Sequence, residues 1–285
     1  MVLYKYHGAG NDFLLADIRE HSSAGHFDRL NDPCLSFSGS GIRKLCDRHT
    51  GIGADGLMLL ADGTDGADFD MHYYNSDGST GMFCGNGGRC ITAFAADLGI
   101  TPGHDGQYLF NAPDGAHTAM LTEDAGSMKT IRLSMKDVSE IQDFGDGSFF
   151  MDTGTRHLVV FVPDVMAADA VSEGRTLRYD PRFAPAGTNV NFVQMTGDGI
   201  IVRTYEKGVE DETLACGTGI VASAIASVAK NALHKRGDCC VKVRARIATL
   251  AVSFRLEADG SFRNVSLTGP AQYVAKIEVL PEQSS

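Results

Sequence analysis

Two stretches with the pattern of a β-hairpin stand out in the alternation of apolar and polar residues along this chain. The first, DGLMLLADGTDGADFDMHYYN at 55–75, predicts two strands joined by a Gly/Asp turn, and a polar loop then leads to Cys84. The second, NFVQMTGDGIIVRTYE at 191–206, predicts the same arrangement with its turn at 197–199, and KGVEDETLA leads on to Cys216. The pattern indicates two similarly built halves, although similarity this short also arises by chance.

The residues after each cysteine begin with Gly-x-Gly and continue with helical spacing. After Cys84 the run stops at Gly99, and its apolar positions recur at i, i+3, i+4 and i+7: Ile91, Phe94, Ala95 and Leu98. After Cys216 the same spacing precedes a basic stretch at 234–236 and then Gly237: Val221, Ala224, Ile225 and Val228. No charged residue lies between 217 and 229. Helices this apolar are buried, so we expect each to be the central helix of its own domain.

Further strands are predicted around these two helices. The candidates are KTIRLSM at 129–135, TLAVSFRLE at 249–257 and FRNVSLTG at 262–269, with a hairpin turn ADGS at 258–261. Strands and helices do not alternate regularly, which disfavours a doubly wound parallel sheet. We therefore predict an α+β fold of two similar domains, each a mostly antiparallel curled sheet around a central helix. We place the first domain at 1–117, joined by a C-terminal strand at 268–285, and the second at 118–267.

Composition narrows the class of protein. The 285 residues are 43% hydrophobic and carry a net charge of −11, which argues against a nucleic-acid partner. The sequence offers no window of eighteen uncharged apolar residues, so we expect no membrane span. The opening MVLYKYHGAG lacks the apolar core of a signal peptide, and we expect a cytoplasmic protein.

Seven cysteines raise the question of disulfides and metals. Their odd number, irregular spacing and lack of a C-x2-C pair favour free thiols and no metal site. Five are expected to be small core residues: Cys34, Cys46, Cys90, Cys239 and Cys240.

Cys84 and Cys216 are expected to differ from the other five cysteines, because each begins a predicted helix. Unpaired N–H groups and the helix dipole favour a thiolate there and lower the thiol pKa from about 8.5. The glycines that follow would admit a carboxylate to the same N–H groups. A purely structural role for both cysteines is the alternative. Two thiols at equivalent places suggest symmetric proton chemistry, in which one thiolate removes a proton from a carbon and the other thiol delivers one to the opposite face.

Five motifs in order resemble the diaminopimelate epimerase family. They are YHGAGNDFLL at 6–15, DRHTGIGADG at 47–56, YYNSDGSTGMFCGNGGR at 73–89, GTNVNFVQ at 187–194 and RTYEKGVEDETLACGTG at 203–219. The resemblance implies two domains with the active site in the cleft between them. It also implies a pyridoxal-independent isomerase that interconverts LL- and meso-diaminopimelate in lysine and peptidoglycan-precursor biosynthesis, and a homodimer. No pyridoxal-binding lysine or metal cluster is readable, so we expect no cofactor.

The resemblance also assigns roles to individual residues. It makes Cys84 and Cys216 the base and acid pair, with His157 and Glu206 beside the thiols, where they would accept from the reacting ammonium and tune the cysteine pKa values. The remaining residues would bind substrate: Asn11, Asn75, Gly85, Asn86, Asn189, Lys207, Gly217 and Thr218. Among these, Asn75 and Asn189 are expected near the distal end of the substrate, and the two helix starts would hold the reacting carboxylate.

Three positions depart from the family's usual pattern. Lys207 stands where Arg is usual, Thr155 and Arg156 precede His157 where Asn-Pro is frequent, and Gly56 stands where some members have Gln. Arg presents a planar fork of donors to a carboxylate, whereas Lys presents a point charge. The departures therefore bear on how the distal end of the substrate is recognised. One hypothesis is that Arg156 replaces part of the missing fork.

Rival interpretations fit the motifs less well. Proline racemases and hydroxyproline epimerases also use paired cysteines, but HGAGNDF and YEKGVEDETLACGTG match them poorly. Phenazine-biosynthesis isomerases have no use for two thiols. A thiol redox module would be expected to have C-x-x-C, which is absent here, and a binding module would need no second thiol.

Overall fold

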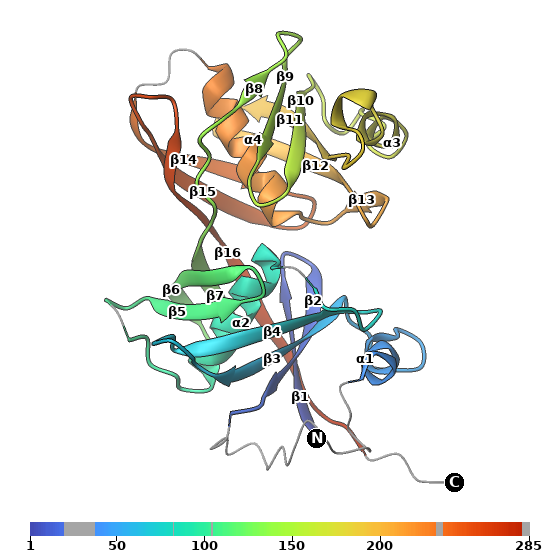
Figure 1. The fold of residues 1–285 in the computed structure, drawn as a ribbon, viewed down its shortest axis with the longest axis vertical. Helices are drawn as coiled ribbons and strands as arrows, with labels where there is room; N and C mark the ends of the chain where they lie inside the picture. The colour runs from blue at the N-terminus through green and yellow to red at the C-terminus, as the bar shows by residue number, and fades with distance from the viewer. Residues whose placement is uncertain (20–37, 82, 104, 232–235, 281–285) are drawn as a thin grey trace. The chain divides into compact units, whose positions relative to one another are not determined.

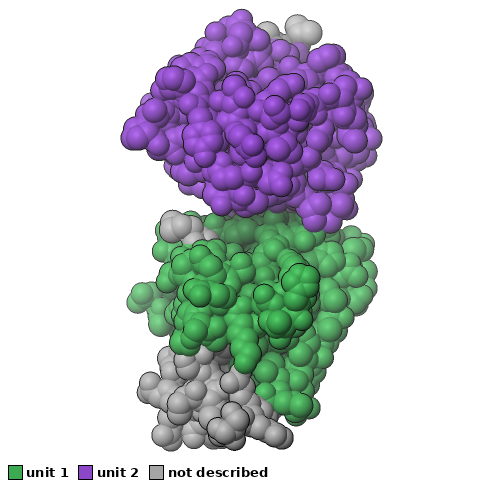
Figure 2. Space-filling view, turned by 90° about the vertical axis from the view of Figure 1, so that its right-hand side faces the viewer, with its two compact units in different colours: residues 1–133, 270–285 green, residues 134–269 purple. Residues whose placement is uncertain are grey.

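The computed structural model describes residues 1–19, 38–81, 83–103, 105–231 and 236–280. The chain divides into two compact units, which are coloured separately in Figure 2. Unit 1 is Met1–Leu133 with Pro270–Ser285, and unit 2 is Ser134–Gly269. None of the helices in the described ranges is long and apolar enough to cross a membrane.

Unit 1 is built on a ring of neighbouring strands that pack against helix α2 (Figure 1). The order is β1-β2-β3-β4-β5-β6-β7-β16, and β16 pairs with β1 to close the ring. The strands are β1 Val2–Gly8, β2 Asn11–Asp17, β3 Gly56–Asp62, β4 Phe69–Asn75, β5 Tyr108–Ala112, β6 Gly115–Ala125, β7 Met128–Ser134 and β16 Phe262–Glu278. Helix α1, Gly39–Cys46, connects β2 to β3, and α2, Gly85–Asp97, connects β4 to β5.

Unit 2 repeats this plan around helix α4. Its strands follow the order β16-β15-β14-β12-β11-β10-β9-β8, with β13 paired to β12. The strands are β8 Gln142–Asp143, β9 Ser148–Asp152, β10 Arg156–Phe161, β11 Asn189–Thr196, β12 Gly199–Glu206, β13 Asp211–Thr213, β14 Gly237–Arg244 and β15 Thr249–Leu256. The helices are α3 Ser172–Arg178, the 3-10 turn η1 Pro181–Phe183 and α4 Gly217–Lys230.

The two units share one sequence of connections. In unit 1, β2 and β3 run parallel with α1 between them, β3 and β4 form a hairpin, and β4 and β5 run parallel with α2 between them. In unit 2, β10 and β11 are parallel across α3, β11 and β12 form the hairpin, and β12 and β14 are parallel across α4. The predicted repeat of hairpin, loop, cysteine and central helix is confirmed, and so is the α+β class.

The central helices are buried because their sequences leave no polar face for water. In α2 every residue from Gly85 to Ala95 is buried, and the Phe94 ring packs on Tyr4 and Tyr6 of β1. The helix stops as predicted, since Gly99 adopts a φ of 75° that disfavours side chains with a Cβ. In α4 the side chains from Gly219 to Val228 are buried, and each large apolar one contributes about 1.5–3 kcal/mol to folding.

Several boundaries differ from the sequence prediction. Unit 1 continues to Leu133 instead of residue 117, because β6 pairs with β5 and β7 pairs with β6. Its C-terminal part begins at Pro270 rather than at 268. Helix α4 ends at Lys230, earlier than the basic stretch suggested, and residues 232–235 lie outside the described residues.

The remaining cysteines are free thiols where the structure describes them. Cys46 and Cys90 are buried as expected, and Cys239 is half-buried. Cys240 is exposed, so its core assignment was wrong: successive residues of β14 point to opposite faces of the sheet. Cys34 lies outside the described residues.

Candidate active site

The two central helices begin in the same way. Cys84 is the N-cap of α2, with φ −120° and ψ 121°, and Cys216 is the N-cap of α4, with φ −105° and ψ 112°. Neither side chain makes a capping hydrogen bond to its first turn. Each sulfur therefore stands at the positive end of a helix whose first N–H groups are not capped by that residue.

The second glycine of each Gly-x-Gly serves packing. A Cβ on Gly87 would lie 2.2 Å from Cε of Met58, and a Cβ on Gly219 would lie 2.3 Å from Oδ1 of Asn191. A side chain at Gly219 would displace the hydrogen-bonded amide of Asn191, and one at Gly87 would displace the end of the Met58 side chain, so these glycines let the helix start lie close to its sheet. The sequence argument gave them a role in ligand approach alone, and it missed this one.

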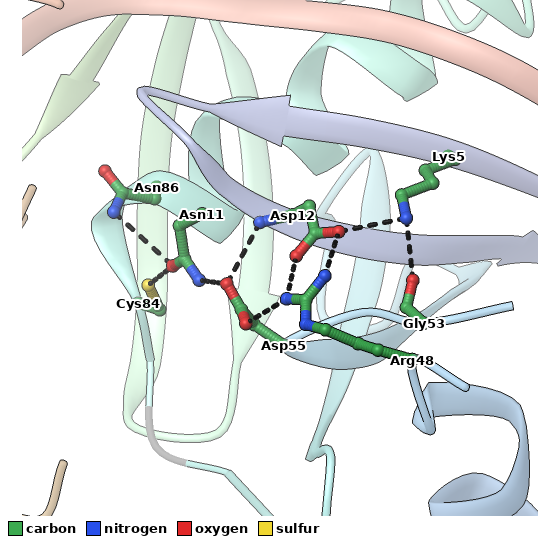
Figure 3. Close-up of polar contacts among 8 residues, drawn as sticks. All are labelled: Lys5, Asn11, Asp12, Arg48, Gly53, Asp55, Cys84 and Asn86. Carbon is green, nitrogen blue, oxygen red and sulfur yellow. Dashed lines mark hydrogen bonds and ion pairs between the residues drawn. The ribbon is translucent and has the colours of Figure 1, made fainter. Parts of the chain in front are cut away.

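The surroundings of Cys84 are polar and ordered by hydrogen bonds (Figure 3). The Cys84 thiol donates to Oδ1 of Asn11 over 3.5 Å, and Nδ2 of Asn86 donates to the same oxygen over 3.4 Å. Nδ2 of Asn11 donates to the Asp55 carboxylate. Because Asp55 can only accept, it fixes the Asn11 amide with its oxygen toward the sulfur.

A charged cluster supports this arrangement from β1, β2 and the loop before β3. Arg48 bridges the carboxylates of Asp12 and Asp55 over 2.7 Å each, and Lys5 pairs with Asp12 over 3.0 Å. Burial raises the pKa of Asp12, but hydrogen bonds and charge from Arg48 and Lys5 outweigh it, so its pKa lies below the usual range. The two cations balance the two carboxylates.

Cys216 lies beside hydroxyl and imidazole groups. Its sulfur is 3.5 Å from Oγ1 of Thr218, and that oxygen is 2.9 Å from Nε2 of His157. Oγ1 of Thr155 is also 2.9 Å from Nε2 of His157. A hydrogen-bonded path therefore connects the thiol of Cys216 to the ring of His157.

His157 is completely buried, and its tautomer follows from its neighbours. Burial lowers the pKa of His157 from 6.5 to about 3, so the ring is neutral. Nδ2 of Asn191 donates to the Leu158 carbonyl and lies 3.1 Å from Nδ1 of the ring, which must accept. The proton therefore sits on Nε2, which donates toward the hydroxyls of Thr155 and Thr218.

Other predicted substrate ligands in unit 2 also shape the backbone. Asn189 is buried, donates to the carbonyl of Arg156 over 2.9 Å and accepts from the backbone N–H of Lys207 over 2.8 Å. Lys207 is exposed, and Glu206 is the half-buried last residue of β12. Asn189 thus ties the residues before His157 to those after Glu206.

Arg156, the candidate replacement for part of the missing fork, makes two contacts within unit 2. Its guanidinium donates to the carbonyl of Phe183 over 3.2 Å and lies 5.1 Å from the centre of the Phe150 ring. Its role toward a substrate carboxylate stays a prediction.

Asn75 and Gly56 face one another across β4 and β3. Nδ2 of Asn75 donates to Oγ of Ser79 over 3.0 Å. A Cβ at Gly56 would lie 2.5 Å from the carbonyl oxygen of Tyr74, so this chain has no room there for a longer residue.

Within unit 1 the structure brings together Cys84, Asn11 and Asn86; within unit 2 it brings together Cys216, Thr218 and His157. The sequence analysis missed Asp55 and Asn191, which orient these groups. Asp55 stands within the DRHTGIGADG motif, and Asn191 is a polar residue between the apolar Val190 and Phe192, so both gave a readable signal. Among the described residues, no group of three His, Cys, Asp or Glu side chains is arranged to hold a metal ion.

Comparison with known proteins agrees with this geometry. The family model described as "Diaminopimelate epimerase" matches residues 3–138 and 149–274. A diaminopimelate epimerase of Flavobacterium psychrophilum is 42% identical over 275 residues, covering 96% of this chain and 98% of the relative. One of Chlorobaculum tepidum is 40% identical over 276 residues, covering 94% and 96%.

Solved structures with a similar fold also align with this chain. A phenazine biosynthesis protein of the PhzF family from Bacillus anthracis aligns with a TM-score of 0.73 and 11% identity, covering 98% of this chain and 99% of that one. A probable proline racemase from Agrobacterium radiobacter aligns with a TM-score of 0.67 and 18% identity, covering 98% and 92%. At these identities the likeness concerns the fold alone. With the family match spanning nearly all of the sequence, the chain belongs to the diaminopimelate epimerase family.

Proposed function

We propose that this protein inverts one α-carbon of LL-2,6-diaminopimelate to give meso-diaminopimelate, in lysine and peptidoglycan-precursor biosynthesis. The observation that carries the proposal is a thiol at the N-cap of the central helix in each repeat of a family member. The reaction requires one sulfur to take the α-proton and the other to deliver a proton to the opposite face. In the reverse direction the sulfurs exchange roles.

Each thiol has neighbours that suit both of its charge states. The thiol of Cys84 donates to Asn11, while its thiolate is favoured by the N-terminus of α2. The Thr218 hydroxyl can accept from the thiol of Cys216 or donate to its thiolate. A group that must be an acid in one direction and a base in the other needs both states to be accessible.

His157 acts on Cys216 through Thr218. The neutral Nε2–H tautomer donates to the Thr218 oxygen, which leaves the Thr218 proton to point toward sulfur. Glu206, as the last residue of β12, is proposed to accept from the reacting ammonium of the substrate. The role of His157 is supported by its contact with Thr218, and that of Glu206 by the family resemblance.

Substrate binding is proposed to use the two helix starts and the amides around them. The N–H groups at Gly85, Asn86, Gly217 and Thr218 suit a carboxylate, because the positive ends of α2 and α4 lie there. Asn11 is proposed to bind the reacting end. The distal end is assigned to Asn75, Asn189 and Lys207.

We further propose that the protein works in the cytoplasm as a homodimer and without a cofactor. The free thiols of Cys46, Cys90, Cys239 and Cys240 support the cytoplasmic setting, since free thiols persist in a reducing compartment. The dimer follows from the family resemblance alone.

The experiment that tests the function is conversion of LL-diaminopimelate by the purified chain, followed by proton NMR. The assay is run with a chelator and a carbonyl-trapping reagent, and meso product should still form. Cys84→Ala and Cys216→Ala should each lower the rate by about 10²–10⁴-fold, as for loss of a general acid or base. Cys90→Ala is the control and should stay near wild type, because Cys90 is a buried core residue. An alanine variant at 84 or 216 with normal circular dichroism and substantial activity would contradict the mechanism.

A further inference from the structure

Arg89 of unit 1 does not belong to the cluster of Lys5, Arg48, Asp12 and Asp55, in which two cations balance two carboxylates. Arg89 is completely buried in α2, where it is the single charge among the buried residues of that helix. It donates to three neutral oxygens: the carbonyl of Pro270 over 3.3 Å, the carbonyl of Gly85 over 3.2 Å and Oδ1 of Asn86 over 2.9 Å. Among the described residues no carboxylate pairs with it. A buried cation without an anion is costly, so a counter-charge is expected during function.

The nearby carboxylates are already neutralised. Asp12 on β2 pairs with Lys5 and Arg48, and Asp55 before β3 pairs with Arg48. Two thiols flank Arg89 on its own helix, Cys90 and Cys84, and burial raises the pKa of the Cys90 thiol well above its usual range. Cys84 is half-buried at the N-cap, so it is the thiol of this group that can become the anion.

Arg89 also sets the direction of an amide in the site. Its Nη2 donates to Oδ1 of Asn86, which turns Nδ2 of Asn86 toward Oδ1 of Asn11, the acceptor of the Cys84 thiol. The packing leaves the guanidinium little freedom. A Cβ on Gly8 would lie 2.8 Å from the carbonyl oxygen of Asn86 and 3.3 Å from Nη2 of Arg89.

We propose that Arg89 is a positioning residue for the Cys84 thiolate: it supplies the buried positive charge that the thiolate requires, and it holds the Asn86 amide in place. The inference rests on the proposed role of Cys84. At the corresponding position of α4, five residues after Cys216, the chain has Val221 in place of an arginine. The two thiols are therefore unequal in the free protein, with Cys84 the more readily ionised.

The test is the pH dependence of iodoacetamide alkylation, read for each cysteine by peptide mapping of the full chain. In wild type, Cys84 should react with a lower pH midpoint than Cys216. Arg89→Met should raise the Cys84 midpoint by about 1–2 pH units, the effect of losing a nearby opposite charge. The Cys216 midpoint should stay unchanged, and Cys90 should stay protected if unit 1 is folded.

Arg89→Lys separates charge from structure. It keeps the charge and loses the planar fork, so the Cys84 midpoint should stay near wild type while kcat/KM falls through Asn86. If Arg89→Met exposes Cys90, unit 1 of that variant is not folded, and Arg89→Lys becomes the test. The proposal is overturned if Arg89→Lys keeps Cys90 protected and yet raises the Cys84 midpoint as far as loss of the charge would. A folded Arg89→Met with an unchanged Cys84 midpoint overturns it as well. Alkylation needs no substrate, so a shifted midpoint supports the role of Arg89 even if diaminopimelate is not converted.

Discussion

Burial of the neutral His157 should make the protein sensitive to mild acid. The pKa of this ring is lowered from 6.5 to about 3 by burial, so below pH 6.5 the unfolded chain takes up a proton that the folded chain refuses. The stability that the neutral His157 contributes is fully present above pH 6.5 and is lost as the pH falls from 6.5 toward 3. Within that window the slope from this group is about 1.4 kcal/mol per pH unit.

Between pH 8 and pH 5 the loss from His157 alone amounts to about 2 kcal/mol. The assay is urea unfolding by far-UV circular dichroism at both pH values, for wild type and for His157→Gln, which keeps a donor near the Nε2 position. Wild type should lose about 2 kcal/mol more than the glutamine variant on acidification, because the other titrating groups cancel in the difference. His72→Gln, at an exposed position on β4, is the control and should behave like wild type. Equal acid losses in wild type and His157→Gln would refute a buried neutral imidazole.

Three further predictions follow from single contacts. Lys207→Met should raise KM for diaminopimelate by roughly fivefold, or about 1 kcal/mol for an exposed ion pair, and Lys207→Arg should be tolerated; an unchanged KM would remove Lys207 from the distal site. Asp55→Ala should lower kcat/KM by about tenfold, because the Asn11 amide loses the charged acceptor that orients it; steady-state kinetics with normal folding would show this. Gly219→Ala should destabilise unit 2 by about 1–3 kcal/mol in urea unfolding, since its Cβ would meet Asn191, whereas Gly197→Ala, whose Cβ meets nothing within 4 Å, should not.

The elements that the sequence predicted best are those specified by local periodicity. The hairpins at 55–75 and 191–206 and the helices after Cys84 and Cys216 all appear, because apolar spacing and turn residues act over a few positions. The first domain boundary depends on the pairing of β6 and β7 with the other strands of unit 1. A short window of sequence does not show which strands pair with one another.

The sequence singled out the candidate cysteines but not the residues that orient their neighbours. Both N-cap cysteines stand out by position, Asn11 lies within a quoted motif, and His157 was named through the family resemblance. The orientation of the His157 ring depends on Asn191, and that of the Asn11 amide on Asp55, through contacts between segments far apart in sequence. Arg89 could have been noticed as the one charged residue between 85 and 96, yet coordinates are needed to see that no carboxylate in the described part of the chain pairs with it.

The most direct test of the two-thiol mechanism is the position of deuterium when LL-diaminopimelate is converted in D2O and stopped at low conversion. A thiol carries a single proton, so the sulfur that takes the substrate's proton holds only that proton, while the opposite sulfur delivers one from solvent. The mechanism predicts deuterium at the inverted α-carbon of meso product and almost none in recovered LL substrate. Equal deuterium in recovered substrate and product, or inverted product that keeps its original proton, would contradict it.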